Sequence, residues 1–192
     1  LQEHLKRIDL NGKVEDAKIP STYRIRYEIS GVPKISIVIP NMDHVVTLRT
    51  CIDSILTKTT YKNYEIIIVE NNSVERNTFA YYEELKNDPR IHIATWKGIF
   101  NYSEINNFGV QQAATGDYLI LLNNDIEVIT PDWIEEMLMF AQRSDVGAVG
   151  AMLYYPDDTI QHAGVILGIG GVAGHAHKYL PRGSYGYMSR AT

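Results

Sequence analysis

The chain has 192 residues, of which 45% are hydrophobic and 21% are charged, and it carries a formal net charge of −5 at pH 7. This composition supports one domain with a sizeable core and excludes a disordered chain. The negative charge argues against nucleic acid as a partner, because general nucleic-acid binders carry a basic face. The single cysteine, Cys51, excludes an intrachain disulfide and fits a reducing compartment.

Residues 1–33 are expected to form an N-terminal lead-in or linker. Within them, residues 1–8 can form a short amphipathic helix, and residues 23–29 can form an edge strand in an otherwise turn-rich stretch. The chain begins at Leu1 and ends at Thr192 without a terminal feature. We therefore expect the rest of a larger polypeptide to accompany it.

From residue 34 onward, strand and helix patterns alternate. Strands are predicted at residues 34–40, 64–70, 90–96, 117–124, 146–155 and within 159–171. Helices are predicted at residues 44–59, 74–88, 103–116 with Gly116 as C-cap, and from Thr130 to about Arg143 with Pro131 as the first helical residue. The runs ISIVI, EIIIV and YLILL lack polar alternation, which is typical of strands covered on both faces. The pattern predicts an α/β fold, with a Rossmann-like, mostly parallel sheet and helices on both faces.

Polar residues follow three of these expected strands, at residues 41–43, 70–73 and 123–125. In open parallel sheets, ligands bind beyond the carboxyl ends of the strands. Asn and Asp are also ordinary turn formers and helix N-caps, so each stretch has a structural explanation on its own. Three such stretches at one edge of a sheet, however, predict a binding site.

The order of four segments carries a resemblance to a known family. The segments ISIVIPNMDHVVTLRTCIDSIL, YEIIIVENNS, NFGVQQAATGDYLILLNNDIEV and PDWIEEML resemble glycosyltransferase family 2, whose members use nucleotide sugars and have the GT-A fold. The resemblance is nearest to bacterial enzymes that build O-antigen, rhamnan or other surface polysaccharides. It implies a nucleotide-sugar-binding GT-A core at residues 34–155. It also implies the start of an acceptor-side region with a Gly-rich flap at 156–192, with the C-terminal acceptor part truncated.

The resemblance also implies roles for individual residues. Pro40 and Asn41 would lie against the nucleotide, and Glu70 and Asn71 would read its base. An Asn amide both donates and accepts hydrogen bonds, so Asn71 can pair with the edge of a uracil or thymine. Near the diphosphate or sugar, the resemblance places three residues of the helix before the fourth strand: Asn106, Asn107 and Gly109. That helix can equally be a packing element.

The triplet Asn123-Asn124-Asp125 falls on the Asp-X-Asp motif of the family. Asn124 is expected at the donor, and Asp125 keeps the carboxylate that would hold Mg²⁺ or Mn²⁺ on the diphosphate. Hard divalent cations need only one or two carboxylates when phosphate oxygens complete the shell. Asn123 replaces the first Asp, which weakens the metal prediction, although its oxygen can contact ribose or a metal-bound water.

No Asp or Glu occurs from Thr159 to Thr192, a stretch that contains several basic residues, Arg182 and Arg190 among them. This asymmetry reflects either chance or a surface that meets an anion. The two segments IQHAG and GHAHK also occur together in the bacterial polysaccharide enzymes that the chain resembles. This co-occurrence implies contacts to donor phosphate or acceptor for three residues: His162, His175 and Lys178. The alternative is that the histidines are ordinary polar surface residues, since His175 and His177 alone make an incomplete metal site.

The stretch GIGGVA at residues 168–173 matches the dinucleotide fingerprint G-x-G-x-x-G/A. That fingerprint requires a helix directly after it and an acidic residue about 20 positions on. No acidic residue follows in this chain. We therefore predict a Gly-rich flap near the active site instead of a dinucleotide loop.

These observations predict a glycosyltransferase domain. It would transfer a hexosyl or rhamnosyl group, with inversion, from a UDP- or dTDP-sugar to a saccharide or lipid-linked saccharide acceptor of a bacterial surface polysaccharide. For such enzymes we expect a cytoplasmic location, peripheral at the inner face of the cytoplasmic membrane. The alternatives are a non-catalytic sugar-nucleotide-binding or scaffold module of a larger synthase and, less favoured, a nucleotidyltransferase. The last would carry a Gly-rich basic loop after the first strand, and PNMDHVVTLR contains no glycine.

An inverting transfer needs a general base for the acceptor hydroxyl. In the family this is an Asp or Glu well after the metal motif. Asp157 and Asp158 come too soon and lie in an expected turn. We therefore expect the base beyond Thr192, and expect the isolated chain to transfer sugar poorly.

Overall fold

The computed structural model describes residues 1–17, 19–189 and 191. The chain forms two compact units, Leu1–Glu136 and a second that begins at Met137, and each is described by itself. Arg190 of the basic stretch lies outside the described residues. Among the residues described, no helix combines the length and the hydropathy needed to cross a bilayer. The domain boundaries predicted from the sequence stay predictions.

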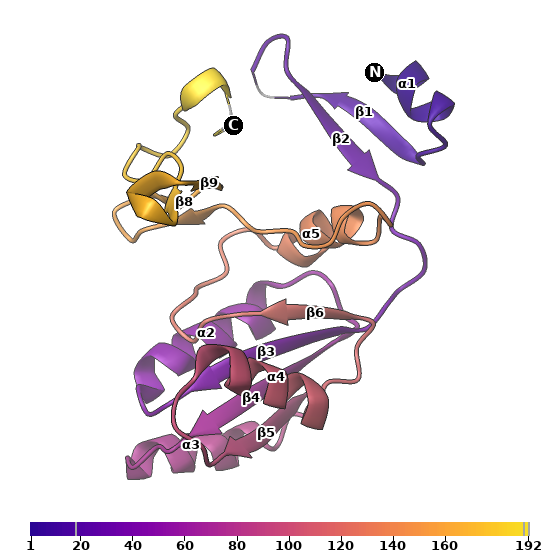
Figure 1. The fold of residues 1–192 in the computed structure, drawn as a ribbon. Helices are drawn as coiled ribbons and strands as arrows, with labels where there is room; N and C mark the ends of the chain where they lie inside the picture. The colour runs from indigo at the N-terminus through magenta and orange to yellow at the C-terminus, as the bar shows by residue number, and fades with distance from the viewer. Residues whose placement is uncertain (18, 190, 192) are drawn as a thin grey trace. The chain divides into compact units, whose positions relative to one another are not determined.

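The first unit begins with a helix and a hairpin (Figure 1). Helix α1 is Gln2–Arg7, and strands β1 (Gly12–Asp16) and β2 (Tyr23–Tyr27) pair antiparallel. The helix and β2 agree with the prediction. Strand β1, GKVED, was not predicted, because it is charged and lacks the β-branched alternation of a strand with one buried face.

The centre of the first unit is a four-stranded parallel sheet (Figure 1). Its strands are β3 (Ile35–Asn41), β4 (Tyr64–Asn71), β5 (Ile91–Trp96) and β6 (Tyr118–Leu121), in the order β5-β4-β3-β6. The connecting helices are α2 (Val45–Lys58), α3 (Arg76–Leu85) and α4 (Tyr102–Ala113). The predicted α/β fold with a mostly parallel sheet is confirmed.

Helices cover both faces of this sheet. Helix α4 packs on the face formed by Val38, Ile67 and Val69, whereas α2 and α3 lie on the opposite side (Figure 1). Strand β4 is buried along its whole length, which explains why its sequence shows no polar alternation. Helix α2 buries an apolar stripe at helical spacing that includes Leu48, Ile52 and Ile55. Complete burial of each such side chain contributes roughly 1.5–3 kcal/mol.

Three local predictions were wrong. Most of the strand predicted at 146–155 is irregular, and only Leu153–Tyr154 (β7) remains. Its first half is rich in glycine and alanine, which offer little side chain for a sheet to pack. Helix α4 ends with Ala114 as its C-cap, not Gly116. Helix α5 begins at Trp133, so Pro131 lies in the preceding turn and is not the first helical residue.

The second unit consists of short antiparallel pairs. Strand β7 pairs with β8 (Ile160–His162), and β9 (Val165–Leu167) pairs with β10 (Ala173–His175). Helix α5 (Trp133–Ala141) runs into this unit, and two short 3₁₀ turns follow, Ile169–Gly171 and Tyr187–Ser189. The GIGGVA stretch forms the turn between β9 and β10, where Gly168, Gly170 and Gly171 have positive φ. No α-helix follows it within the described residues, which excludes the dinucleotide loop; the flap stays a prediction.

Candidate functional site

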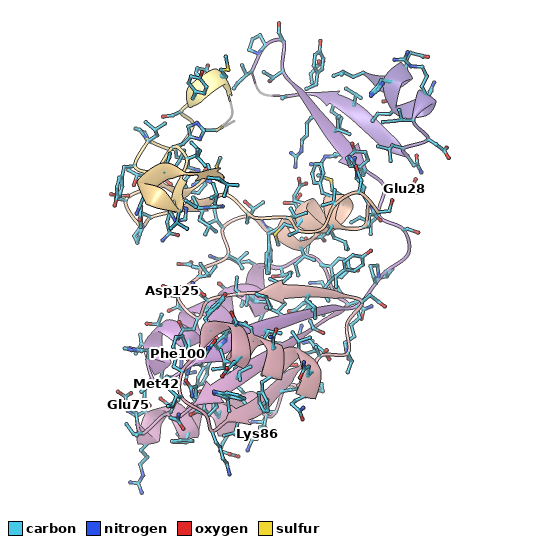
Figure 2. All side chains as sticks on the ribbon, in the orientation of Figure 1. Glu28, Met42, Glu75, Lys86, Phe100 and Asp125 are labelled. Carbon is cyan, nitrogen blue, oxygen red and sulfur yellow. The ribbon has the colours of Figure 1, made fainter. Side chains whose placement is uncertain are left out.

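The three polar stretches predicted at the strand ends lie side by side. Strand β3 is the neighbour of both β4 and β6, and Asn41 lies opposite Glu70 in the parallel ladder. The residue after β6 continues the pairing, since Leu122 N donates to Val38 O at 2.9 Å. In Figure 2, Met42 and Asp125 mark this carboxyl end of the sheet. We call it the strand-end rim.

Hydrogen bonds join the tips of the rim directly. Asn124 Nδ2 donates to Asn41 Oδ1 at 2.7 Å, which connects the loop after β6 to the end of β3. Asn41 Nδ2 in turn donates to the Tyr82 hydroxyl at 2.8 Å. Tyr82, on α3, donates to Glu70 Oε2 at 2.7 Å. One continuous network therefore ties three strand ends to a helix.

Glu70 is committed to this network. Its carboxylate accepts from Ser73 N and Ser73 Oγ, both at 2.6 Å, and from Tyr82. Burial first, and then the neighbouring Glu70, raise the pKa of Tyr82, so its hydroxyl stays protonated and donates. The predicted contact of Glu70 with the nucleotide base stays a prediction. In the structure, its hydrogen bonds stabilise the rim.

Asn71 is buried and ties the end of β4 to the loop after β5. Its Nδ2 donates to Gly98 O at 3.2 Å, and the neighbouring Asn72 Nδ2 donates to the same carbonyl at 2.9 Å. Pro40, half-buried, sits one residue before Asn41 in the ladder. The nucleotide contacts predicted for Pro40 and Asn71 stay predictions.

Asp43 and Tyr82 are parts of the rim whose roles the sequence did not reveal. The Asp43 carboxylate accepts from Val74 N at 3.0 Å and Glu75 N at 2.9 Å, and so holds the entry to α3. The spacing of α3 predicts that Tyr82 is buried, but not which partner its hydroxyl finds.

The backbone of the rim is locally strained. Asp43, His44 and Asn72 have φ values of 52°, 49° and 57°, a left-handed conformation that costs energy for residues other than glycine. Such conformations persist where the surrounding structure fixes them, and they concentrate at functional sites. Their presence at two adjacent strand ends favours a binding role for the rim.

The loop that carries Asp125 is fastened to one face of α2. The Cys51 thiol lies 3.8 Å from Asn123 O, Ser54 Oγ accepts from Val128 N at 3.0 Å, and Lys58 Nζ bonds Glu127 at 2.7 Å. These three α2 residues are spaced at i, i+3 and i+7 and therefore share a face.

Held in this way, the loop exposes the Asp125 carboxylate to solvent, whereas the Glu127 carboxylate is engaged in an ion pair. Asn123 and Asp125 are exposed, Asn124 is half-buried, and the Glu127 carboxylate pairs with Lys58. Burial, with a smaller effect of the Asp125 charge, raises the pKa of the Cys51 thiol to about 12. Cys51 is fully buried.

The donor set of the rim fits a hard cation that a ligand completes. Among the described residues, no group of three or more His, Cys, Asp or Glu side chains could hold a metal ion without help. An exposed carboxylate next to two amide side chains offers only oxygen ligands that suit Mg²⁺ or Mn²⁺. The residues therefore fit an ion that shares its shell with phosphate oxygens, and do not fit a closed metal site.

Helix α4 packs Gly109 against the sheet. A Cβ on this residue would lie 2.6 Å from Val69 Cγ2 and 2.8 Å from Val38 Cγ1, so only glycine allows the close approach. Gly109 therefore has a packing role in the structure, and its predicted contact with diphosphate or sugar stays a prediction.

The two asparagines of α4 differ in environment. Asn106 is buried, and its Nδ2 donates to Tyr102 O at 2.7 Å, while its Oδ1 has no hydrogen-bond partner among the residues that the structure describes. A buried acceptor without a partner is uncommon and favours a role beyond packing. Asn107 is exposed. Donor contacts of both residues stay predictions.

The remaining predicted residues belong to the second unit and are described within it. His162 Nδ1 and His175 Nδ1 lie 2.9 Å apart, so strands β8 and β10 bring the two imidazoles into contact. Lys178 is exposed beside the rings of Tyr155 and Tyr179. The contacts predicted for these three residues with donor phosphate or acceptor stay predictions.

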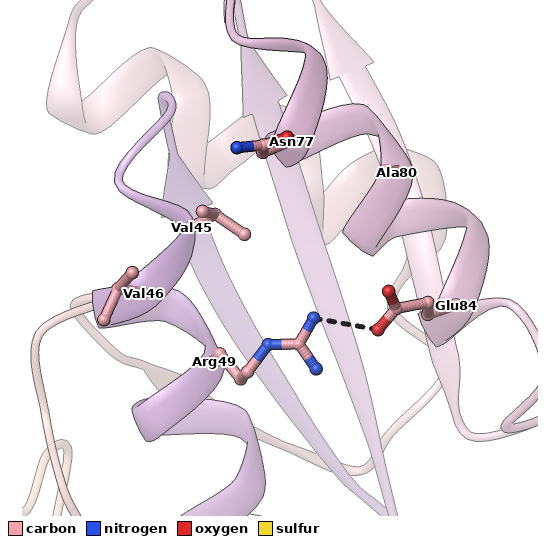
Figure 3. A pocket seen from close by; sticks show the side chains of 6 residues that line it. All are labelled: Val45, Val46, Arg49, Asn77, Ala80 and Glu84. Atoms are coloured by element: carbon pink, nitrogen blue, oxygen red, sulfur yellow. Dashed lines mark hydrogen bonds and ion pairs between the residues drawn. The ribbon is translucent and has the colours of Figure 1, made fainter.

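A hollow of about 280 Å³ lies between α2 and α3 (Figure 3). Arg49 crosses it to Glu84 at 2.8 Å and stacks 4.0 Å from the centre of the Tyr81 ring. The hollow is lined by Val45, Val46, Arg49, Asn77, Ala80 and Glu84. None of these is a predicted site residue, and an ion pair already occupies its charged groups.

Comparison with known proteins decides the family. A sequence profile described as "Glycosyl transferase family 2" matches residues 36–179, about three quarters of the chain. The chain belongs to glycosyltransferase family 2. The family assignment agrees with the sequence resemblance and covers the strand-end rim.

Two curated bacterial relatives of this family 2 chain are similar over nearly all of it. The uncharacterised protein y4gI of Sinorhizobium fredii is 46% identical over 99% of the chain, which covers 21% of that protein. The O-antigen biosynthesis protein RfbC of Myxococcus xanthus is 45% identical over 95% of the chain, which covers 14% of that protein. The chain thus spans about a fifth of the length of these relatives or less.

A solved structure shares the fold. The mannosyltransferase PcManGT of Pyrobaculum calidifontis, in complex with GDP-Man and Mn²⁺, superposes with a TM-score of 0.57 at 16% identity. The match covers 67% of this chain and 38% of the mannosyltransferase. The family 2 chain therefore has the GT-A fold.

Proposed function

We propose that this chain binds a UDP- or dTDP-sugar at the strand-end rim. From this nucleotide sugar, a hexosyl or rhamnosyl group would be transferred to an acceptor during bacterial surface polysaccharide synthesis. The observation that carries the proposal is the 2.7 Å bond from Asn124 to Asn41, which joins two strand ends beside the exposed Asp125. The name of the Myxococcus xanthus relative, an O-antigen biosynthesis protein, supports the polysaccharide assignment.

Asp125 would hold a Mg²⁺ or Mn²⁺ ion on the donor's diphosphate. The ion supplies charge neutralisation for the departing nucleoside diphosphate. The mannosyltransferase with the same fold was solved with GDP-Man and Mn²⁺, which supports a divalent cation for the fold. The chain's own contribution is preorganisation: α2 and Asn41 fix the Asp125 loop before the donor arrives.

The acceptor side of the reaction rests on other parts of the protein. We propose that a saccharide or lipid-linked saccharide attacks with inversion, and that the general base lies beyond Thr192, since no Asp or Glu follows Asp158. The rest of the larger polypeptide is then a partner of this chain. The reaction would take place in the cytoplasm, at the inner face of the cytoplasmic membrane.

A second candidate function is a non-catalytic, sugar-nucleotide-binding or scaffold module of a larger synthase. The observation that favours it is Asn123, which stands where the Asp-X-Asp motif has its first carboxylate. This module would keep the fold and lose the cation dependence of donor binding.

Titration calorimetry separates these functions. UDP, dTDP, GDP and UTP are titrated into the chain with Mn²⁺ and, in parallel, with EDTA. We expect UDP or dTDP to bind at least about tenfold more tightly with Mn²⁺, equivalent to about 1.4 kcal/mol. Equal affinity in EDTA would favour the non-catalytic module, and absence of heat with every nucleotide would overturn donor binding. Preference for a nucleoside triphosphate would indicate a nucleotidyltransferase.

A further inference from the structure

The second unit contains a cluster of two tyrosines and a lysine that the proposed donor site does not use. The rings of Tyr155 and Tyr179 are stacked, with centroids 5.6 Å apart and planes 13° apart. Lys178 Nζ lies 4.9 Å from the centre of the Tyr179 ring and 5.9 Å from that of Tyr155. We call these three residues the Tyr-Lys-Tyr cluster.

Paired backbone supports the cluster. Ile160 N donates to Leu180 O, and Tyr179 N donates to Ile160 O, both at 2.8 Å. Tyr155 N donates to Thr159 O at 2.8 Å within the adjoining turn. The two segments that carry the stacked tyrosines therefore run side by side, and Ile160 between them is fully buried. The cluster is held on paired backbone and not on a free loop.

The acidic groups nearest in sequence are already engaged. Asp158 pairs with Arg182 at 3.1 Å, and Asp157 accepts from the hydroxyl of Thr159 at 2.7 Å. No Asp or Glu follows Asp158 in the sequence. Within the described part of its own unit, Lys178 has no carboxylate partner.

The lysine is charged and open to solvent. The adjacent phenol groups of Tyr155 and then of Tyr179 raise the pKa of Lys178, so the ammonium is protonated at neutral pH. Lys178 is exposed, and 65% of Tyr179 is accessible. The cluster thus offers an ammonium, two phenol hydroxyls and an accessible aromatic ring in one place.

These groups match one class of ligand. The C–H faces of a sugar ring can stack on an aromatic ring, whose face is electron-rich. Phenol hydroxyls donate to and accept from sugar hydroxyls. The ammonium, which has no carboxylate partner in the described part of its unit, favours an anionic group on the same sugar. We propose that the Tyr-Lys-Tyr cluster binds a saccharide that carries a carboxylate or phosphate; this rests on the transferase function proposed above, in which that saccharide is the acceptor.

Residue-resolved NMR of the ¹⁵N-labelled 192-residue chain tests the proposal. Four probes are titrated at low ionic strength: a glucuronate-containing tetrasaccharide, neutral chitotetraose, glucose 6-phosphate, and UDP with Mg²⁺. We expect the tetrasaccharide with glucuronate to shift the amides of Tyr155, Lys178 and Tyr179 and to bind about tenfold more tightly than chitotetraose. Whether glucose 6-phosphate shifts the same amides tells whether phosphate can replace carboxylate.

Variants test the individual groups. Lys178→Gln should reduce the affinity for the acidic tetrasaccharide about tenfold, to that of the neutral one, because a charge-assisted hydrogen bond is lost. Tyr179→Leu should weaken the binding of both saccharides, since it removes the stacking ring. Tyr185→Ala is the matched control, because Tyr185 is exposed in the same unit but outside the cluster. It should change neither affinity.

The outcomes distinguish this inference from the donor function. Equal binding of acidic and neutral saccharides, or amide shifts that avoid the cluster, overturns the inference even if UDP shifts the amides around Asp125. Saccharide binding at the cluster without any response to UDP supports the site and contradicts the transferase role of the rim. A Lys178→Gln variant that keeps the preference for the acidic saccharide also overturns the inference.

Discussion

The side chains of Asn41 and Asn124 form a hydrogen bond of 2.7 Å between the end of β3 and the loop after β6. Asn124 is the donor, so its amide is already used inside the protein, and the bond holds the loop that presents Asp125. Asn124→Ala should therefore weaken Mn²⁺-dependent binding of the sugar nucleotide by about tenfold, since one hydrogen bond contributes roughly 0.5–1.5 kcal/mol.

Calorimetry with UDP and Mn²⁺ measures this effect. Asn87→Ala serves as the control, because Asn87 is an exposed asparagine after α3 that bonds only the local Glu84 carbonyl in the described structure. Unchanged affinity in Asn124→Ala would show that the loop does not depend on the bond.

Loss of the hydroxyl group should destabilise the protein at Tyr82 but not at Tyr81, the adjacent tyrosine of α3. Tyr82 bridges Asn41 and Glu70, so Tyr82→Phe leaves both without that partner and should cost about 1–2 kcal/mol of unfolding free energy. The buried hydroxyl of Tyr81 has no hydrogen-bond partner in the described part of the chain, so Tyr81→Phe should be neutral or stabilising. Urea unfolding compares the two variants, and equal destabilisation would contradict the assigned bridge.

The carboxylates of Asp125 and Glu127 should differ in their effect on the cation. Asp125 is exposed at the rim, and Glu127 pairs with Lys58. Asp125→Asn should therefore remove the Mn²⁺ dependence of nucleotide binding, whereas Glu127→Gln should keep it. Both variants are titrated with UDP in Mn²⁺ and in EDTA, and loss of the dependence in Glu127→Gln alone would move the predicted metal ligand to that residue.

The sheet could be predicted because its strands are covered on both faces. Their β-branched runs carry no polar alternation, and the polar stretches that follow them mark the carboxyl ends where parallel strands meet. The strand predicted at 146–155 failed because its glycines and alanines fit a strand pattern without providing packing area.

The connections within the rim could not be predicted from the sequence. Helical spacing buries both Tyr81 and Tyr82, but which hydroxyl finds a partner depends on where α3 crosses the strand ends. The same limit applies to Gly109, whose sequence context suited a ligand contact and whose position requires packing. Both the partner of the tyrosine hydroxyl and the packing of Gly109 depend on contacts between distant parts of the chain, which no local sequence pattern reveals.

The packing role of Gly109 is testable by separating stability from affinity. A methyl group there would meet Val69 and Val38 at 2.6 and 2.8 Å, so Gly109→Ala should destabilise the fold by roughly 1–3 kcal/mol through overpacking. The nucleotide affinity of the folded fraction should not change. Gly147→Ala is the control, because no atom lies within 4 Å of its added Cβ. A loss of affinity without loss of stability would instead support the predicted ligand contact of Gly109.

Glu65 should make the stability of the chain depend on pH. Burial of its carboxylate would raise the pKa, but hydrogen bonds from Lys34 Nζ at 2.5 Å, Ser36 Oγ at 2.6 Å and Thr115 N at 2.7 Å outweigh burial and lower the pKa to about 2. A pKa lowered on folding stabilises the protein above the unfolded value of 4.5. That contribution, on the order of 3 kcal/mol, is lost as pH falls from about 5 to about 2.

Glu65→Gln should remove this pH dependence. The variant loses the charge at every pH, so it should be less stable than the wild type by on the order of 3 kcal/mol at pH 7 and close to it near pH 2. Urea unfolding across this range measures the difference. Glu83→Gln is the control, because the Glu83 carboxylate pairs with Lys86 on the surface and contributes little. A stability difference between wild type and Glu65→Gln that stays constant from pH 7 to pH 2 would show that the effect is steric, since only loss of an ionised group produces a difference that disappears in acid.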